Sequence, residues 1–155
     1  MVVNGLNGET PEFTYILSYN ITTLAGSTQG DGEIFNNPTG IAIDKDGNVY
    51  VADYFNHKIK KITSSGEVST LAGISQGDGE NFNHPIGVAV DENGNVYVSD
   101  QWNHKIKKVT PEGVISTFAG ITAGDGDQFN TPTGIAVDKD GNVYVGDLLN
   151  HKIKK

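Results

Sequence analysis

The sequence predicts an all-β protein built from a repeated four-stranded antiparallel unit, and three observations support this. Residues 40–61 return at 87–108 and again at 134–155, and the step is constant because 87 − 40 and 134 − 87 are both 47. Within each copy, β-branched and aromatic residues alternate with a period of two, which is typical of strands. Gly accounts for 20 of the 155 residues, which suits many short strands joined by tight turns. Repeats of this length with four short strands each indicate the blades of a β-propeller.

Each strand of the unit can be assigned from its first copy. Residues 41–43 and 49–51 are expected to form two strands, because Asp44 and Gly47 between them favour a hairpin turn. A third strand is expected at residues 57–62 and a fourth at residues 68–72, after a turn. A loop then leads to the next copy and carries a recurring phenylalanine, which we expect to fill the gap between neighbouring blades; the three are Phe35, Phe82 and Phe129.

These residues resemble the NHL repeat, a family named for the motif that Asn56-His57-Lys58-Ile59 matches here. The resemblance covers residues 20–155, where the glycines, the Asp after the second strand, the Asn-His pair and a closing Leu-Ala-Gly recur in phase. NHL propellers usually have six blades, so the resemblance implies that number of blades here.

The phase of the repeat predicts the domain organisation. Residues 1–19 are expected to form a leader with a possible extra strand, and residues 20–155 half of a propeller. That half consists of a lone outer strand at residues 20–26, whole blades at residues 40–72 and 87–119, and three strands of a further blade at residues 134–155. The chain stops at a repeat boundary, which suggests an engineered or excised fragment.

Three blades cannot close a ring, because the wedge angle of each would exceed the twist that packed sheets adopt. We therefore expect a six-bladed homodimer, with a nine-bladed trimer as the alternative. The outer strand of one chain would complete the last blade of the other. The assembly interface would then comprise Ile21, Thr22, Thr23, Leu24 and Ala25 of one chain and His151, Lys152, Ile153 and Lys154 of the other.

Composition argues against several classes of partner. The net charge is −8 and all 11 basic residues are lysine, so we expect no nucleic acid, whose binding depends on phosphate contacts. No stretch is long enough to cross a membrane, so we expect no membrane partner. The first ten residues lack the basic start and apolar core of a signal peptide, so we expect a protein that is cytoplasmic as expressed or one from which a targeting segment was removed. The absence of cysteine excludes disulfides and thiolate metal sites.

Histidine and aspartate recur in the repeat, and for both we expect structural roles. The repeated histidines His57, His104 and His151 open the third strand, about 10 Å farther from the axis than the first strand at roughly 4.8 Å per strand. They are thus too far apart to share an ion, and we expect them to satisfy local backbone groups. His84 lies in an inter-blade loop and is a weak candidate for a metal ligand. We nevertheless predict that the protein binds no metal and no cofactor. The aspartates that end the second strands, Asp53, Asp100 and Asp147, are expected to cap the following turns.

The repeat varies most at the turn between the second and third strands. The variable pairs are Tyr54 and Phe55, Gln101 and Trp102, and Leu148 and Leu149. Apolar and aromatic residues at exposed turns favour a surface that binds a protein or peptide, and Asp31, Asp78 and Asp125 of the inter-blade loops are expected to surround it. The alternative is that Phe55, Trp102 and Leu149 pack between blades.

We therefore predict a non-enzymatic scaffold or protein- or peptide-binding module that assembles with itself. The NHL family includes a zinc-dependent lyase that cleaves hydroxyglycine peptides with non-equivalent His, Arg and Tyr residues. This chain has no Arg, and three of its four histidines are repeat positions, so we assign no catalytic residue. The alternative is a metal-dependent lyase or hydrolase with its site at the propeller pore.

Overall fold

The computed structural model of the chain describes residues 20–26, 34–74, 81–121 and 128–155. These residues form three antiparallel sheets and three short 3-10 turns, which confirms the all-β prediction and agrees with propeller blades. The first sheet contains β1 (Pro38–Ile43), β2 (Val49–Asp53), β3 (Lys58–Ile62) and β4 (Val68–Ala72). The second contains β5 (Pro85–Val90), β6 (Val96–Asp100), β7 (Lys105–Val109) and β8 (Ile115–Ala119). The third contains β9 (Pro132–Val137), β10 (Val143–Asp147) and β11 (Lys152–Lys154).

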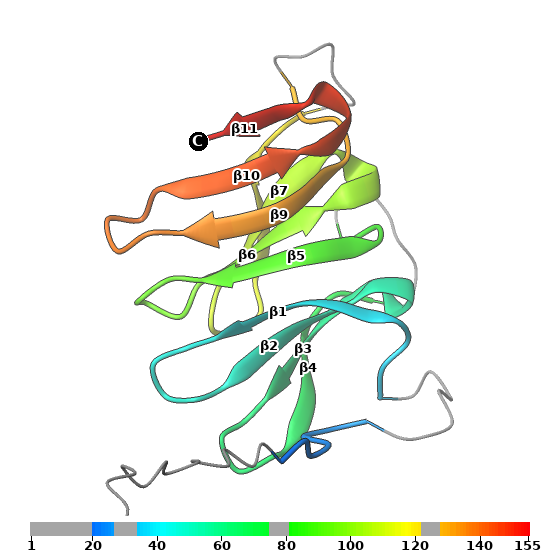
Figure 1. Cartoon of the computed structure of the whole chain (residues 1–155), viewed down its shortest axis with the longest axis vertical. Helices are drawn as coiled ribbons and strands as arrows, with labels where there is room; N and C mark the ends of the chain where they lie inside the picture. Colours follow the sequence, from blue (N-terminus) through cyan, green and yellow to red (C-terminus); the bar gives the residue numbers. More distant parts are fainter. Residues whose placement is uncertain (1–19, 27–33, 75–80, 122–127) are drawn as a thin grey trace, which may run out of the picture.

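The strands of each sheet follow one another in sequence order, and the innermost strands β1, β5 and β9 lie side by side (Figure 1). Each sheet begins at its proline, two residues before the predicted start, because Pro38, Pro85 and Pro132 are already paired with the end of the second strand. Proline is tolerated at the first residue of a strand, where its missing N–H breaks little of the ladder. The β1–β2 turn is held by Asp44, which accepts hydrogen bonds from the backbone N–H groups of Asp46 and Asn48, both at 2.9 Å.

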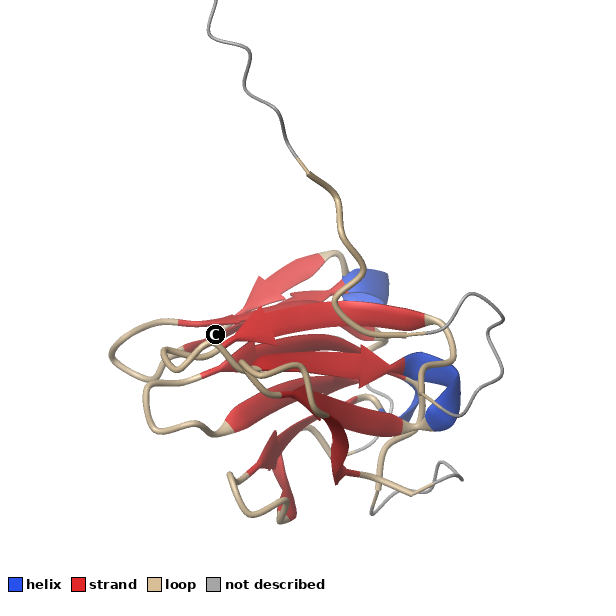
Figure 2. Cartoon of the chain, turned by 90° about the horizontal axis from the view of Figure 1, so that it is seen from below, coloured by secondary structure: helices blue, strands red, loops and turns tan. Residues whose placement is uncertain are grey.

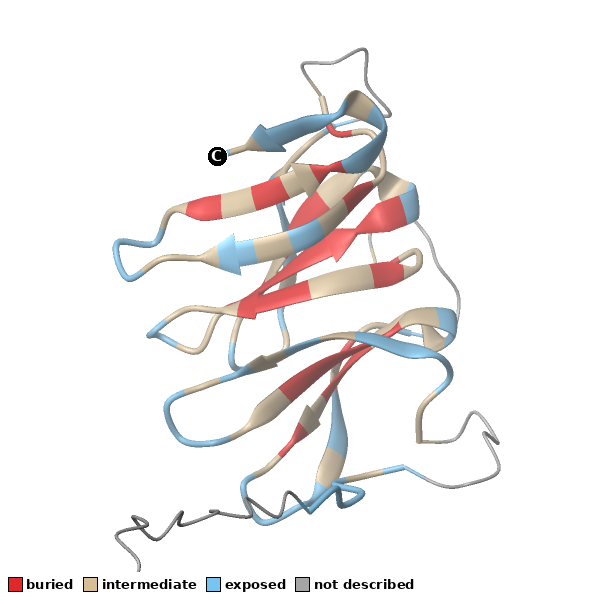
Figure 3. Cartoon of the chain, in the orientation of Figure 1, coloured by how far each residue is buried: buried red, intermediate tan, exposed pale blue. Residues whose placement is uncertain are grey.

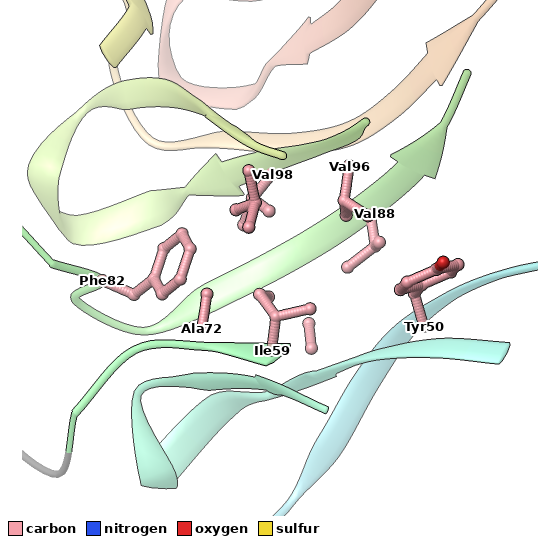
Figure 4. Close-up of a cluster of buried hydrophobic side chains, with 9 residues drawn as sticks. Tyr50, Ile59, Ala72, Phe82, Val88, Val96 and Val98 are labelled. Carbon is pink, nitrogen blue, oxygen red and sulfur yellow. The ribbon is translucent and has the colours of Figure 1, made fainter. Parts of the chain in front are cut away.

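The hydrophobic core consists of two layers, one between each pair of neighbouring sheets. The first layer joins Tyr50, Ile59 and Ala72 to Val88, Val96 and Val98 of the second sheet (Figure 4). Phe82 is fully buried in this layer, and Phe129 lies in the second layer, so both fill gaps between blades as predicted. The second sheet, covered on both sides, is the most completely buried of the three (Figure 3).

Neighbouring innermost strands approach so closely that they require glycine. A Cβ atom at Gly40 would collide with the backbone oxygen of Ile86, and one at Gly87 with the backbone oxygen of Thr133. The glycines that open the first two repeated stretches are therefore needed where one blade touches the next, and not in a turn.

The structure differs from the sequence prediction at residues 20–26. These residues belong to no strand of this chain, and residues 20–24 are exposed. A strand exists only where a neighbour satisfies its backbone groups, and the structure holds a single chain. Pairing of this segment with a second copy stays a prediction.

No helix in the described part of the chain is long and apolar enough to cross a membrane.

Candidate functional site

One end of the strands carries three 3-10 turns, which include all six of the variable turn residues (Figure 2). The turns are η1 (Tyr54–Asn56), η2 (Gln101–Asn103) and η3 (Leu148–Asn150). Their central N–H groups donate to carbonyl oxygens of the inter-blade loops, from Phe55 to Asn36 and from Trp102 to Asn83, both at 3.1 Å. The turns and these loop residues therefore form one surface, which we name the turn face.

A buried aspartate anchors each part of the turn face. The side chains of Asp53, Asp100 and Asp147 are at most 1% exposed. In the first blade, Oδ1 of Asp53 accepts a hydrogen bond from the backbone N–H of Asn36 at 2.6 Å, and Oδ2 accepts one from Nδ2 of Asn56 at 2.8 Å. The other two blades repeat both contacts. The predicted capping role is wrong, because these carboxylates join the loop to the turn and do not cap its N–H groups.

The repeated aspartates differ in electrostatic environment. Burial raises the pKa of Asp100 to about 6, and the hydrogen bonds from Asn83 and Asn103 offset this only in part. Burial also acts on Asp147, but hydrogen bonds from Asn130, Asn150 and Lys154 outweigh it and lower the pKa of Asp147. The ammonium group of Lys154 lies 2.9 Å from Oδ2 of Asp147.

The repeated histidines join one blade to the next. The backbone N–H of His84 donates to Nδ1 of His57 at 3.1 Å, and the N–H of Thr131 donates to Nδ1 of His104 at 3.0 Å. The expectation that these imidazoles satisfy backbone groups is thus correct for His57 and His104. Because Nδ1 accepts a hydrogen bond, the imidazole of His57 is neutral, and burial lowers its pKa accordingly.

His84 lies at the centre of a group of rings that we name the aromatic cluster. Its ring centroid is 4.4 Å from that of His57, 4.7 Å from Tyr54, 4.7 Å from Trp102 and 5.8 Å from Phe55. Burial and the neighbouring His57 lower the pKa of His84, which favours its uncharged form. The sequence signal that could have pointed to this cluster is the difference between His84 and its repeat equivalents, Asn37 and Thr131.

The structure brings some of the predicted binding residues together across the first blade junction. The hydroxyl of Tyr54 donates to Oε1 of Gln101 at 3.2 Å, and Gln101 is buried. About half or more of each of the other four side chains is exposed: 51% for Phe55, 60% for Trp102, 52% for Leu148 and 56% for Leu149. Tyr54 and Gln101 thus pack against each other across the junction, and Phe55 packs in part against His84. An exposed apolar surface remains at Phe55, Trp102, Leu148 and Leu149. The predicted residues Asp31, Asp78 and Asp125 lie outside the described residues.

Across the described ranges, no three His, Asp or Glu side chains lie close enough to one another to hold a metal ion. The absence of a metal at His84 stays a prediction.

Comparisons with known proteins identify the fold. The family described as the NHL repeat matches residues 35–62, 82–109 and 129–155. No curated protein matches the chain. Among solved structures, the chain is similar to an auxiliary nutrient binding protein from Bacteroides thetaiotaomicron, with a TM-score of 0.63 and 21% identity over 73% of this chain and 35% of that one. It is also similar to virginiamycin B lyase from Staphylococcus aureus, with a TM-score of 0.56 and 18% identity over 75% and 36% of the two chains.

A gluconolactonase from Xanthomonas campestris has the same TM-score of 0.56 and 18% identity, over 71% of this chain and 34% of its own. The prediction of a non-enzymatic protein was therefore wrong as an inference from the fold, because a lyase and a lactonase share it. At these identities the likeness shows the fold alone. The chain spans about a third of the length of these three proteins.

Proposed function

The chain is a member of the NHL-repeat family, and from this premise we propose that it is a self-assembling binding module. Two copies close a six-bladed propeller by exchanging outer strands, and the turn face of that ring binds a protein or peptide. The observation that carries this proposal is that residues 21–25 repeat the sequence pattern of the outer strand β4 but belong to no strand in the described part of the chain. Sheets one and two end in an outer strand, β4 or β8, whereas the described residues provide none beyond β11.

The same chain contains a segment whose sequence matches that of an outer strand. Residues 21–25 lie 47 positions before β4 and have the same apolar pattern, yet residues 21–24 are exposed. They lie beside the first sheet, at the opposite end of the molecule from β11 (Figure 1). The segment therefore cannot complete its own third sheet, whereas two copies arranged head to tail would complete each other's.

Equivalent residues show which faces lack a neighbour. Ile153 of β11 is 79% exposed, whereas Ile59 and Ile106 at the same repeat position are 0% and 1% exposed. At the other end, Ile41 of β1 is 63% exposed and its equivalent Val88 only 6%. Covering such faces stabilises by roughly 25 cal/mol per Å² of apolar surface, which favours association. A second copy would place the face of Ile41 against that of Ile153.

The hydrogen bonds that join neighbouring blades could also form between the two ends of the chain, where the equivalent groups belong to Asn37 and His151. The N–H groups of His84 and Thr131 each donate to the histidine of the preceding blade, and both residues have a left-handed backbone. Asn37 has the same backbone conformation, with φ of 55°. In the proposed ring, its N–H would donate to His151 of the second copy, as the equivalent residues do within one chain.

Light scattering coupled to size-exclusion chromatography tests ring closure. We expect a species of twice the 16.5 kDa chain mass. Ile153→Lys should dissociate it, because the charge would be buried between blades. Val114→Lys is the matched control, since Val114 is 60% exposed in a turn at the outer side of the second sheet, and this variant should keep the mass.

A folded wild-type species of 16.5 kDa would overturn the proposal and indicate that further repeats of a longer chain cover these faces. Three times the chain mass would overturn the dimer in favour of the nine-bladed trimer.

A further inference from the structure

The junction between the second and third sheets contains a pocket on the turn face. Its volume is about 120 Å³, and it is lined by Gln101, Trp102, His104 and Thr131. Gln101 is 9% exposed, so a buried amide forms part of the wall. The cavity is comparable to the engineered apolar cavities of about 150 Å³ that hold one benzene molecule.

The first blade junction shows which side chain fills the space equivalent to this pocket. The four lining residues lie 47 positions after Tyr54, Phe55, His57 and His84, all members of the aromatic cluster. At the first junction the imidazole of His84 packs against the other three rings. Thr131, its equivalent, carries no ring, so the pocket is the space that an imidazole occupies one junction earlier.

The backbone at the two junctions is the same, which makes the comparison direct. His84 and Thr131 have φ of 57° and 59°. Their N–H groups donate to Nδ1 of His57 and His104 at 3.1 and 3.0 Å. The two junctions therefore share their frame and differ in their side chains: Thr131 replaces His84, and Gln101 and Trp102 replace Tyr54 and Phe55.

Thr131 is also an unfavourable residue for its backbone conformation. A β-branched side chain at positive φ is a genuine outlier, whereas Asn37 and His84 belong to the types enriched there. Residues with backbone strain of this kind gather at ligand sites. The open pocket thus coincides with a residue that does not favour its own backbone.

We propose that this pocket binds one uncharged heteroaromatic ring, namely the imidazole of a histidine carried by a partner peptide. Trp102 provides an aromatic wall. The amide Nε2 of Gln101 can donate to the ring nitrogen, since Oε1 already accepts from Tyr54. The inference deepens the binding role proposed above and rests on it, but the pocket lies within one chain and does not require a closed ring.

Trp102 reports binding directly, because it is the only tryptophan in the chain. The probes are imidazole and N-acetyl-histidine methylamide at pH 8, where both are uncharged, with N-acetyl-alanine methylamide as the negative control. We expect a saturable change of tryptophan fluorescence with an unchanged lifetime, which indicates a complex. A linear decrease with a shortened lifetime shows collision only and would overturn the proposal.

Two substitutions exchange the residues at the equivalent positions 84 and 131 of the two junctions. Thr131→His fills the pocket with the residue of the first junction and should abolish saturable binding, whereas the control Val114→His, at an exposed position outside the pocket, should leave the Kd unchanged. His84→Thr opens an equivalent pocket and should raise the stoichiometry from one to two probes per chain. Undiminished binding to Thr131→His, or a stoichiometry of one in His84→Thr, would contradict the proposal.

The mass of the same samples separates this inference from ring closure. Saturable binding by a 16.5 kDa species would keep the pocket and overturn the dimer. A dimer without saturable binding would overturn the pocket and keep the ring.

Discussion

At the scale of single residues, the repeats act as internal controls for one another. Ala52, Ser99 and Gly146 occupy the same repeat position. Ser99 is fully buried, and its hydroxyl is the one buried side-chain polar atom of the described residues that lacks a hydrogen-bond partner. An unsatisfied buried hydroxyl costs about 1–3 kcal/mol, so the middle blade carries a local instability that the first blade avoids.

We expect Ser99→Ala to raise the free energy of unfolding by about 1 kcal/mol, because it removes the unsatisfied hydroxyl and leaves a methyl group that the first blade already buries. Urea denaturation at fixed protein concentration measures the change. The reciprocal variant Ala52→Ser should destabilise by a similar amount. Destabilisation by Ser99→Ala would mean that the hydroxyl has a partner after all.

The aspartates allow a second comparison within the chain, this time against pH. In the folded state the pKa of Asp100 is raised to about 6, above its ordinary value, so the folded protein holds this proton more tightly than the unfolded one. The stabilisation that protonated Asp100 provides is therefore lost as the pH rises from about 4 to 6. Over this range Asp100 lowers the free energy of unfolding by up to about 1.4 kcal/mol per pH unit. Asp147 has a lowered pKa, so its contribution stabilises above about pH 4 and is lost in acid.

We subtract the free energy of unfolding of Asp100→Asn from that of the wild type. This difference should fall as the pH rises from 4 to 6 and should then level off. For Asp147→Asn the difference should have the opposite slope and should fall only below about pH 4. Urea denaturation at several pH values measures both. Parallel curves for the two variants would show that the two environments are alike.

At the scale of elements, strand positions could be predicted because they depend on local pattern. The fourth strand of the first blade was predicted at residues 68–72 and found there, since alternation and flanking turns specify a strand in a short window. The aromatic cluster could not be predicted. His57 and His84 meet only through the packing of two blades, and their chain positions carry no pattern that specifies a contact.

The role of the repeated aspartates also could not be predicted from the sequence. Capping and loop anchoring both place an Asp before a turn, and only the approach of Asn36 to Asp53 distinguishes them. Sequence reasoning therefore identified the turn face as a candidate site but not the network that fixes it.

At the scale of the whole molecule, glycines mark where blades meet. Gly40 and Gly87 face a carbonyl oxygen of the next innermost strand, whereas a Cβ atom at the equivalent Gly134 would meet nothing within 4 Å among the described residues. Gly134 has an ordinary strand backbone and no steric need for glycine within one chain. In the proposed ring, its Cβ atom would meet the backbone oxygen at the position of Thr39 in the second copy.

Gly134→Ala therefore separates chain folding from ring closure. Overpacking of this kind costs about 1–3 kcal/mol at each of the two interfaces of the ring, so we expect the dimer Kd to rise by about thirtyfold to ten-thousandfold while the single chain keeps its circular dichroism spectrum. Analytical ultracentrifugation over a concentration series measures the Kd. Gly87→Ala, the matched variant within the chain, should instead lower the free energy of unfolding, because its Cβ atom collides with Thr133 of the same chain. An unchanged Kd for Gly134→Ala would show that no second copy packs against β9.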